Sequence, residues 1–398
     1  MRFPWIILFF LCPFITLAQS GIITGKVSRA DMKTPVGQAN VFLSNTTSGV
    51  ATTDDGNFTL SGLKPGSYTL VVSIIGFEDY SQNVIVGSEP IKLNIELMPK
   101  VNQLRDVIIT TPANWKRNYE QFVRDFIGTD DNAKYCIVEN PHEVQLIYHR
   151  EKQELEAYTN TFLVVDNLAL GYKVKFLVNE FTSNKLSRII AYTGQRLFKE
   201  LPGSKKQVEE WHKKREDAYY GSAMHFYRSL FADRLADEGF QMMKLTRMLN
   251  PNRAQEEEIQ DKIKHFNDGH SRDSLNYWID QENLSKYFRE HLTREPLAVA
   301  SVLYSTGHPG IYAVDFTDCL YIVYTKKHEE TDFKDVYRPL DMENFETSII
   351  TTSKAYYFDT NGVVFGDNAP LYEGTWSKSK LSDLLPIDYT PDAGSEPQ

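Results

Sequence analysis

Hydrophobic positions in the first hundred residues form short runs separated by turn residues. The runs that cluster or alternate β-forming side chains are residues 22–28, 39–43, 49–53, 57–60, 66–75 and 91–97. Hairpin turns are expected at Asp54-Asp55-Gly56-Asn57 and Leu63-Lys64-Pro65-Gly66, because Gly56 tolerates a positive φ and Pro65 fixes its own. About seven strands in roughly 80 residues predict a small antiparallel β-sandwich over residues 19–99.

The pattern changes after a linker over residues 100–112, in which residues 104–109 are expected to add one strand. Aromatic side chains at helical spacing predict a short amphipathic helix over residues 114–127, which ends before Gly128. Residues 143–190 alternate again, and they predict an antiparallel meander with one covered face.

A helical insertion follows over residues 204–240, where hydrophobic residues recur every three or four positions. Ser204 and Gln207 form a capping box, and a break near Gly221 predicts two helices. Residues 250–296 are highly charged and weakly periodic, so no element is assigned there. The strand pattern returns at residues 301–304, 311–314, 320–324, 348–353, 355–358 and 363–365.

Together these patterns predict an α+β fold that is mostly β. A seven-stranded-type antiparallel β-sandwich precedes a larger antiparallel-sheet domain with a helical insertion over residues 113–390. Residues 391–398 form a polar tail that is expected to be disordered.

The chain begins with the features of an exported protein. Arg2 precedes an apolar run from Trp5 to Leu17, which is the pattern of a cleavable signal peptide over residues 1–18. A membrane span needs about 20 apolar residues, and no such stretch recurs downstream. We therefore expect a protein of the periplasm or cell surface, with outer-membrane association as an alternative and no transmembrane segment after signal cleavage.

Charge argues against one class of partner. The chain carries 43 Lys and Arg against 53 Asp and Glu residues, a formal net charge of −10. Proteins that bind nucleic acid need clustered cations to contact phosphates, so we do not expect a nucleic-acid partner.

Two cysteines, Cys136 and Cys319, remain after signal removal. An oxidising compartment permits a disulfide between them, which would close a long loop across the second domain. Two buried free thiols are the alternative.

Several segments of the N-terminal domain resemble a known family. They are Ile23-Thr24-Gly25-Lys26-Val27, Ala39-Asn40-Val41-Phe42-Leu43, Thr52-Thr53-Asp54-Asp55-Gly56-Asn57-Phe58, Pro65-Gly66-Ser67-Tyr68-Thr69-Leu70 and Gly76-Phe77. They resemble the carboxypeptidase regulatory-like domain, a transthyretin-like β-sandwich. The resemblance implies the fold of residues 21–98 and no particular activity.

The body of the chain resembles carboxypeptidase-like regulatory-domain proteins of the Bacteroidota cell envelope. The motifs are Asn114-Trp115, Tyr119-Glu120-Gln121-Phe122, Phe126-Ile127-Gly128, Asn167-Leu168-Ala169-Leu170-Gly171-Tyr172, Ala218-Tyr219-Tyr220-Gly221-Ser222, His225-Phe226, Glu238-Gly239-Phe240 and Leu384-Leu385-Pro386-Ile387-Asp388-Tyr389. This resemblance implies an envelope location and a body of undefined biochemical function.

Motifs for common hydrolases are absent from the sequence. None of the nine histidines has glutamate three residues later, and neither His-Glu-x-x-His nor Gly-x-Ser-x-Gly occurs. We therefore predict no enzyme, no cofactor, no metal site and no catalytic residue. The remaining enzymatic route is a carboxylate pair, for which Asp166 and Glu180 are candidates, although exposed turn acids are the simpler interpretation.

The densest polar and aromatic group offers a candidate ligand-binding surface. Its members are Tyr219, Tyr220, His225 and Arg228. On a helix, His225 and Arg228 share a face. The structural alternative is that the aromatic rings pack onto the sheet while His225 and Arg228 bond neighbouring backbone.

The leading hypothesis is a non-enzymatic exported envelope protein that acts as a binding or docking module for a protein or glycan partner. The alternative is a periplasmic hydrolase that acts on glycan or peptide through carboxylates without a motif. A third hypothesis is a truncated relative of outer-membrane receptors that carry the same leading sandwich.

Overall fold

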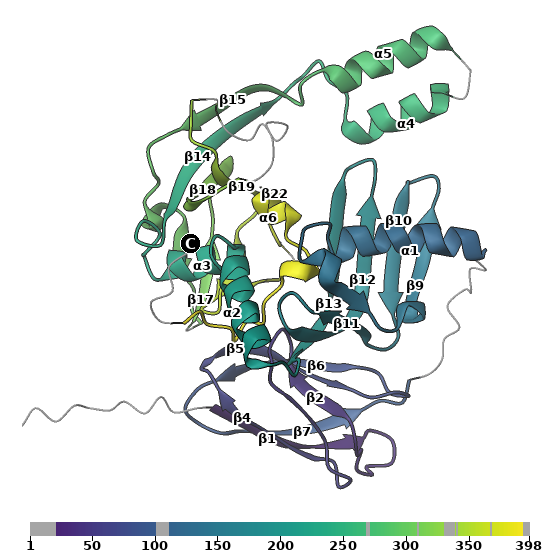
Figure 1. Ribbon diagram of the computed structural model, residues 1–398, viewed down its shortest axis with the longest axis vertical. Coiled ribbons are helices and arrows are strands. Elements are labelled where there is room, and N and C mark those ends of the chain that lie inside the picture. The colour runs from purple at the N-terminus through teal and green to yellow at the C-terminus, as the bar shows by residue number, and fades with distance from the viewer. Residues whose placement is uncertain are drawn as a thin grey trace, which may run out of the picture.

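The chain is α+β and mostly β, with antiparallel pairing in all but one strand pair of its sheets (Figure 1). The computed structural model describes residues 21–100, 111–267, 271–308, 310–329, 339, 341–366 and 368–392. The predicted signal peptide, the linker strand over residues 104–109 and the tail from residue 393 lie outside these ranges. Among the described helices, none is long and apolar enough to cross a membrane.

The N-terminal domain is a sandwich of two sheets. One sheet has the order β4 (Asn57–Leu63), β1 (Gly21–Arg29) and β7 (Ile91–Leu97). The other has the order β3 (Gly49–Ala51), β2 (Asn40–Leu43), β5 (Gly66–Ser73) and β6 (Tyr80–Val86). Strands β1 and β7 run parallel, which differs from the predicted antiparallel arrangement. The reason is topological, since the chain crosses to the second sheet and then returns beside β1.

Alternation along the strands produces the sandwich core. In β4, Phe58, Leu60 and Leu63 are buried between exposed neighbours. The predicted turn before β4 forms at Gly56, which has φ of +78°. A Cβ atom at this position would lie 2.3 Å from the carbonyl oxygen of Val27, so only glycine fits.

The first sheet of the body has six strands covered by one helix. Along the main path the order is β8 (Cys136–Val138), β11 (Leu163–Asn167), β12 (Tyr172–Asn184), β10 (Glu154–Thr159) and β9 (Val144–His149), and β13 (Ile189–Glu200) pairs with β12. The helix α1 (Pro112–Phe126), which was predicted over residues 114–127, covers this sheet. Its Phe122 and Phe126 are fully buried and contact Phe176 and Phe181 of β12.

The helical insertion forms two helices, α2 (Lys205–Tyr219) and α3 (Ala223–Phe231). The predicted capping box between Ser204 and Gln207 is present. Gly221 separates the helices with φ of +86°, and its carbonyl oxygen accepts a hydrogen bond from the Trp376 indole at 2.7 Å. The break is therefore fixed by both local conformation and a distant contact.

Two further sheets complete the body. The larger has the order β15 (Tyr287–Thr293), β14 (Phe240–Leu249), β18 (Cys319–His328), β19 (Phe345–Thr351) and β22 (Leu371–Gly374). The smaller has the order β16 (Leu303–Ser305), β17 (Ile311–Val314), β20 (Tyr356–Asp359) and β21 (Val364–Phe365). Helix α3 packs its buried side into the core that these two sheets share.

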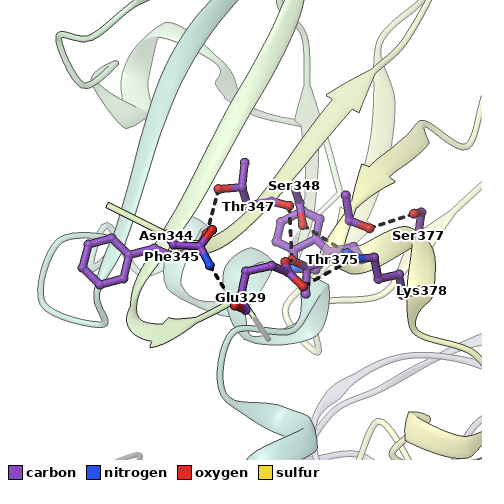
Figure 2. Close-up of polar contacts among 10 residues, drawn as sticks. Glu329, Asn344, Phe345, Thr347, Ser348, Thr375, Ser377 and Lys378 are labelled. Atoms are coloured by element: carbon purple, nitrogen blue, oxygen red, sulfur yellow. Dashed lines mark hydrogen bonds and ion pairs between the residues drawn. The ribbon is translucent and has the colours of Figure 1, made fainter. Parts of the chain in front are cut away.

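The short helix α6 (Thr375–Lys378) is held against the larger sheet by a polar cluster (Figure 2). The Glu329 carboxylate accepts hydrogen bonds from Thr375 Oγ1 at 2.7 Å and Lys378 Nζ at 3.2 Å. The amide of Asn344 donates to the Glu329 carbonyl oxygen at 2.8 Å. These bonds neutralise the acid internally and fix the end of the β18–β19 pair.

A helical hairpin projects from the larger sheet. Helices α4 (Glu256–Asn267) and α5 (Arg272–Asn283) connect β14 to β15, and they lie at the opposite end of the molecule from the sandwich (Figure 1). We call residues 251–285 the arm. No element was predicted here, because charged residues obscure the helical period.

Candidate functional site

The four predicted ligand-binding residues come together at the break between α2 and α3, but they point largely inward. Tyr219 is 6% exposed and His225 is 3% exposed, while Tyr220 and Arg228 are half-buried. The His225 ring lies between aromatic neighbours, with centroids 4.9 Å from both Tyr219 and Phe240. This matches the structural alternative for these residues, and ligand binding by them stays a prediction.

Both ring nitrogens of His225 have partners inside the protein. The Gly221 N–H donates to Nδ1 at 3.2 Å, and Nε2 lies 3.3 Å from the Glu238 carboxylate. Burial lowers the pKa of His225 to about 4, although Glu238 acts in the opposite direction. The ring is therefore neutral at pH 7, with its proton on Nε2, and neither nitrogen is free for a metal or ligand.

Arg228 ties the helix to two other segments. Its guanidinium donates to the backbone carbonyl oxygens of Asn361 at 2.9 Å, Ile387 at 2.8 Å and Tyr389 at 3.0 Å. The group also lies 5.4 Å from the Tyr219 ring centroid. Helix α3, the segment at Asn361 and the segment at residues 387–389 therefore meet at one cation. The guanidinium N–H groups of this cation bond backbone carbonyl oxygens.

Residues 384–390, which we call the C-terminal strap, join the body to the sandwich. The Ile387 N–H donates to the Asn45 carbonyl oxygen at 2.7 Å, and the Ile387 side chain is buried in the sandwich core. The Asp388 carboxylate accepts from the N–H and the hydroxyl of Thr47. This strap contains the motif Leu384 to Tyr389, whose role became evident only from the fold.

The sandwich also contacts the body directly. The Asn45 N–H donates to the Arg196 carbonyl oxygen at 2.7 Å, and the Phe198 N–H donates to the Thr46 carbonyl oxygen at 2.9 Å. Thr46 and Leu197 form a parallel β-bridge at the edge strand β13. We call this contact and the C-terminal strap together the junction, which links the sandwich to the body by backbone hydrogen bonds.

The disulfide considered for Cys136 and Cys319 is not formed. Cys136 lies on β8 of the first body sheet and Cys319 on β18 of the larger sheet, and both thiols are free. Burial raises the pKa of the Cys136 thiol to about 12, so it is not a thiolate at neutral pH. Cys319 is buried and Cys136 is half-buried, and each packs against a different core cluster.

The candidate acids Asp166 and Glu180 do not converge. Asp166 forms an ion pair with Lys173 at 2.9 Å, and Lys173 is its partner across the β11–β12 ladder. Glu180 lies seven residues farther along β12, which is about 20 Å at the rise of a strand, and it is exposed. This spacing is too large for a glycosidase pair, whose carboxyl groups lie about 5–10 Å apart.

A different acid pair is close in space. Asp130 accepts from the Ser382 hydroxyl at 2.6 Å, and Asp383 accepts from the Asn132 amide at 2.9 Å. Burial, together with the charge of Asp130, raises the pKa of Asp383 to about 6. The acids are 253 positions apart in the chain, so no local sequence signal could have found them. Within the described ranges, no three His, Cys, Asp or Glu side chains are placed to hold a metal ion.

The arm packs few of its side chains against the rest of the body. Its helices bury only Ile259 and Gln281, and none of the arm's described residues belongs to the four core clusters. The large apolar residues that stand exposed on the arm and at its root are Met248 (54%), Leu249 (69%), Tyr277 (56%), Ile279 (37%), Leu284 (39%) and Phe288 (69%). An exposed group of this kind is typical of an interaction surface.

The arm is also acidic. Helices α4 and α5 contain seven Asp and Glu residues, four in α4 and three in α5, against three Lys and Arg residues. Three of the acids, Glu256, Glu257 and Glu258, lie in the first turn of α4. On its inner side the arm touches the body, since Lys264 Nζ donates to the Arg150 carbonyl oxygen at 3.1 Å.

Among solved structures the chain has remote likenesses. It is 24% identical to the backbone protein of pilus 2b of group B streptococcus, covering 20% of this chain and 42% of that one, with a TM-score of 0.18. It is 14% identical to a DUF3823 family protein from Bacteroides ovatus, with coverages of 46% and 82% and a TM-score of 0.18. It is 10% identical to a putative carbohydrate binding protein from Bacteroides uniformis, with coverages of 45% and 78% and a TM-score of 0.17. These TM-scores are too low to support any argument.

Comparison with protein families gives a firmer result for the sandwich. The family model of the CarboxypepD_reg-like domain matches residues 23–109, which agrees with the resemblance seen in the sequence and extends ten residues past the predicted domain end. The chain spans less than half of the pilus protein named above. No curated protein matches the chain. The N-terminal β-sandwich of this protein is therefore a CarboxypepD_reg-like domain.

Proposed function

We propose that this chain is a non-enzymatic, exported binding protein of the cell envelope, and that its partner is a protein with a basic surface that docks on the arm. In this proposal the CarboxypepD_reg-like sandwich, the linker and the body (residues 19–99, 100–112 and 113–390) serve as a scaffold that presents the arm. The periplasm or cell surface is the proposed location.

The observation that carries this proposal is the contrast between the arm's size and its packing. The arm uses 35 residues, 251–285, yet buries only two side chains in its helices. Apolar residues that stay exposed gain no burial free energy on folding, so a partner that covers them is the simplest reason for their presence.

Charge indicates the chemistry of the partner. The excess of acids on α4 and α5 favours a partner rich in Lys and Arg, because opposite charges speed the encounter and exclude wrong partners. The exposed Tyr277 and Phe288 then supply the apolar contact at the centre of the interface. Association should therefore weaken as the salt concentration rises.

Site-specific photocrosslinking in the native envelope tests this proposal. A photoreactive phenylalanine replaces Tyr277 or Phe288 in the full chain, and the control places it at Ile75, which is 85% exposed on the sandwich. We expect one basic protein to be crosslinked from Tyr277 on the arm and from Phe288 at its root, and not from Ile75. The same adduct should decrease in the Glu257→Gln, Glu258→Gln double variant. Equal adducts from all three positions, or none from the arm, would contradict the proposal.

A further inference from the structure

Arg196 is unusual among the arginines that are at least half-buried. Arg215 bonds the Leu170 and Gly171 carbonyl oxygens and Glu200, and Arg247 bonds Glu290 and Glu373. The guanidinium of Arg196 forms no hydrogen bond or ion pair with any residue that the structure describes. Its Nε is sealed from solvent without a partner.

Among the described residues, the surroundings of Arg196 are aromatic, and no acid pairs with it. On β13 the residue lies opposite Phe176, and its guanidinium carbon is 5.0 Å from that ring centroid. Burial lowers the pKa of Arg196, and the only nearby group that acts in the opposite direction is the Tyr192 phenol. The cation–π contact with Phe176 is therefore its main local compensation.

Arg196 belongs to the junction through its backbone. The Asn45 N–H donates to the Arg196 carbonyl oxygen, so the two residues are neighbours from different domains. The Asn45 side-chain oxygen is also sealed and without a partner. A half-buried cation left without a polar partner, in a chain that bonds Arg215 and Arg247, indicates that a component is missing beside Arg196.

The shape of the guanidinium indicates what that component is. Arg196 as a whole is half-buried, and of its guanidinium nitrogens only Nε is among the sealed, unpaired atoms. Two parallel N–H groups match the two oxygens of a carboxylate. Such a group would neutralise the cation where no acid of the chain does so.

We propose that Arg196 binds the carboxylate of a small ligand at the junction between the sandwich and the body. This site is separate from the arm, so either proposal can fail without the other. The ligand belongs to the chemical class of small organic carboxylates, of which sodium acetate and sodium D-glucuronate are convenient probes.

Thermal unfolding of the full chain at constant ionic strength tests the site. We expect acetate and D-glucuronate to raise the unfolding midpoint in a saturable manner, and D-glucose to have no effect. In Arg196→Met the apparent affinity should fall at least tenfold. The matched control Arg188→Met, at an exposed arginine in the β12–β13 turn, should behave as wild type. Arg196→Lys keeps the charge but lacks the two parallel N–H groups of the guanidinium, so it should bind acetate more weakly than wild type. This second variant keeps the test decisive if Arg196→Met fails to fold.

Several outcomes would overturn the proposal. One is the absence of any saturable rise in the unfolding midpoint of wild type. That result would mean that the Arg196 guanidinium contacts only water. Another is a shift that survives in both Arg196 variants. Equal stabilisation by inorganic phosphate would overturn the assignment to a carboxylate.

Without ligand, the Arg196→Met variant should be at least as stable as wild type, because the substitution removes an unpaired buried charge.

Discussion

The junction and the arm use polar residues in opposite ways. At the junction, Arg228 donates to backbone carbonyl oxygens and Asp388 accepts from Thr47, while aromatic rings enclose His225 three residues before Arg228. On the arm, charged side chains and large apolar residues both face outward. A dense polar and aromatic sequence therefore marks the interior of this protein, while an irregular charged sequence marks its most exposed surface.

The two regions should also differ in their contribution to stability. Contacts at the junction join segments more than 100 positions apart, so their loss frees long stretches of chain. The arm connects two paired strands that hold each other without it, since β14 and β15 form their own ladder. Substitutions at the junction should therefore be costly, and changes in the arm should not.

The largest effect is expected for Arg228→Ala. The variant leaves three backbone carbonyl oxygens without their charged donor and releases the C-terminal strap, at a cost of roughly 3–5 kcal/mol. Urea unfolding measures this free energy. The control Arg289→Ala, at an exposed arginine of β15, should change it by less than about 0.5 kcal/mol. An equal change in the free energy of unfolding in both variants would contradict the claim that junction residues contribute more to stability than surface residues.

The next largest effect concerns pH and His225. Its folded pKa of about 4 lies below the ordinary value of 6.5, so its contribution to stability is complete above pH 6.5 and is lost as the pH falls toward 4. The loss should reach roughly 2–3 kcal/mol at pH 4.5. Urea unfolding at pH 7 and pH 4.5 should show a smaller acid-induced loss in His225→Phe than in wild type. The same loss in both proteins would show that His225 is not buried as a neutral ring.

A smaller effect of opposite sign is expected for Asp383. Its folded pKa of about 6 lies above the ordinary 3.8, so its contribution is favourable below pH 3.8 and is lost as the pH rises through 6. Asp383→Asn keeps an acceptor for Asn132 and removes the charge, so it should stabilise the protein at pH 7.5 by roughly 1–2 kcal/mol. The exposed control Asp237→Asn should have little effect. A lower unfolding free energy for Asp383→Asn at pH 7.5 would contradict this account.

Local sequence signals were sufficient for much of the fold. Alternation located most strands of the sandwich, and the capping box at Ser204 located the start of α2. Strand β6 was missed because most of its residues are polar and exposed, so it lacks a continuous apolar run. Strand β14 was missed because its apolar residues cluster without alternation directly after two helices.

The candidate site was harder to derive. The sequence identified Tyr219, His225 and Arg228 as a group, but it did not indicate that they face inward. The rings that enclose His225 include Phe240 and Tyr324, which lie on other elements. The role of the C-terminal strap depends on contacts 159 and 161 positions away from Arg228. Local periodicity carries no information about such pairings, so only the fold could supply them.

The most direct test of the central claim is an arm-less protein. Residues 251–285 are replaced by Asn-Gly, which closes β14 and β15 with a two-residue turn between Asn250 and Lys286, already bonded through their backbones. The measurement is the affinity of the crosslinked partner for this protein and for wild type, with urea unfolding as the control for folding. The account predicts an unfolding free energy within about 1 kcal/mol of wild type and a loss of partner binding of at least a hundredfold. Unchanged affinity in a folded arm-less protein would contradict it.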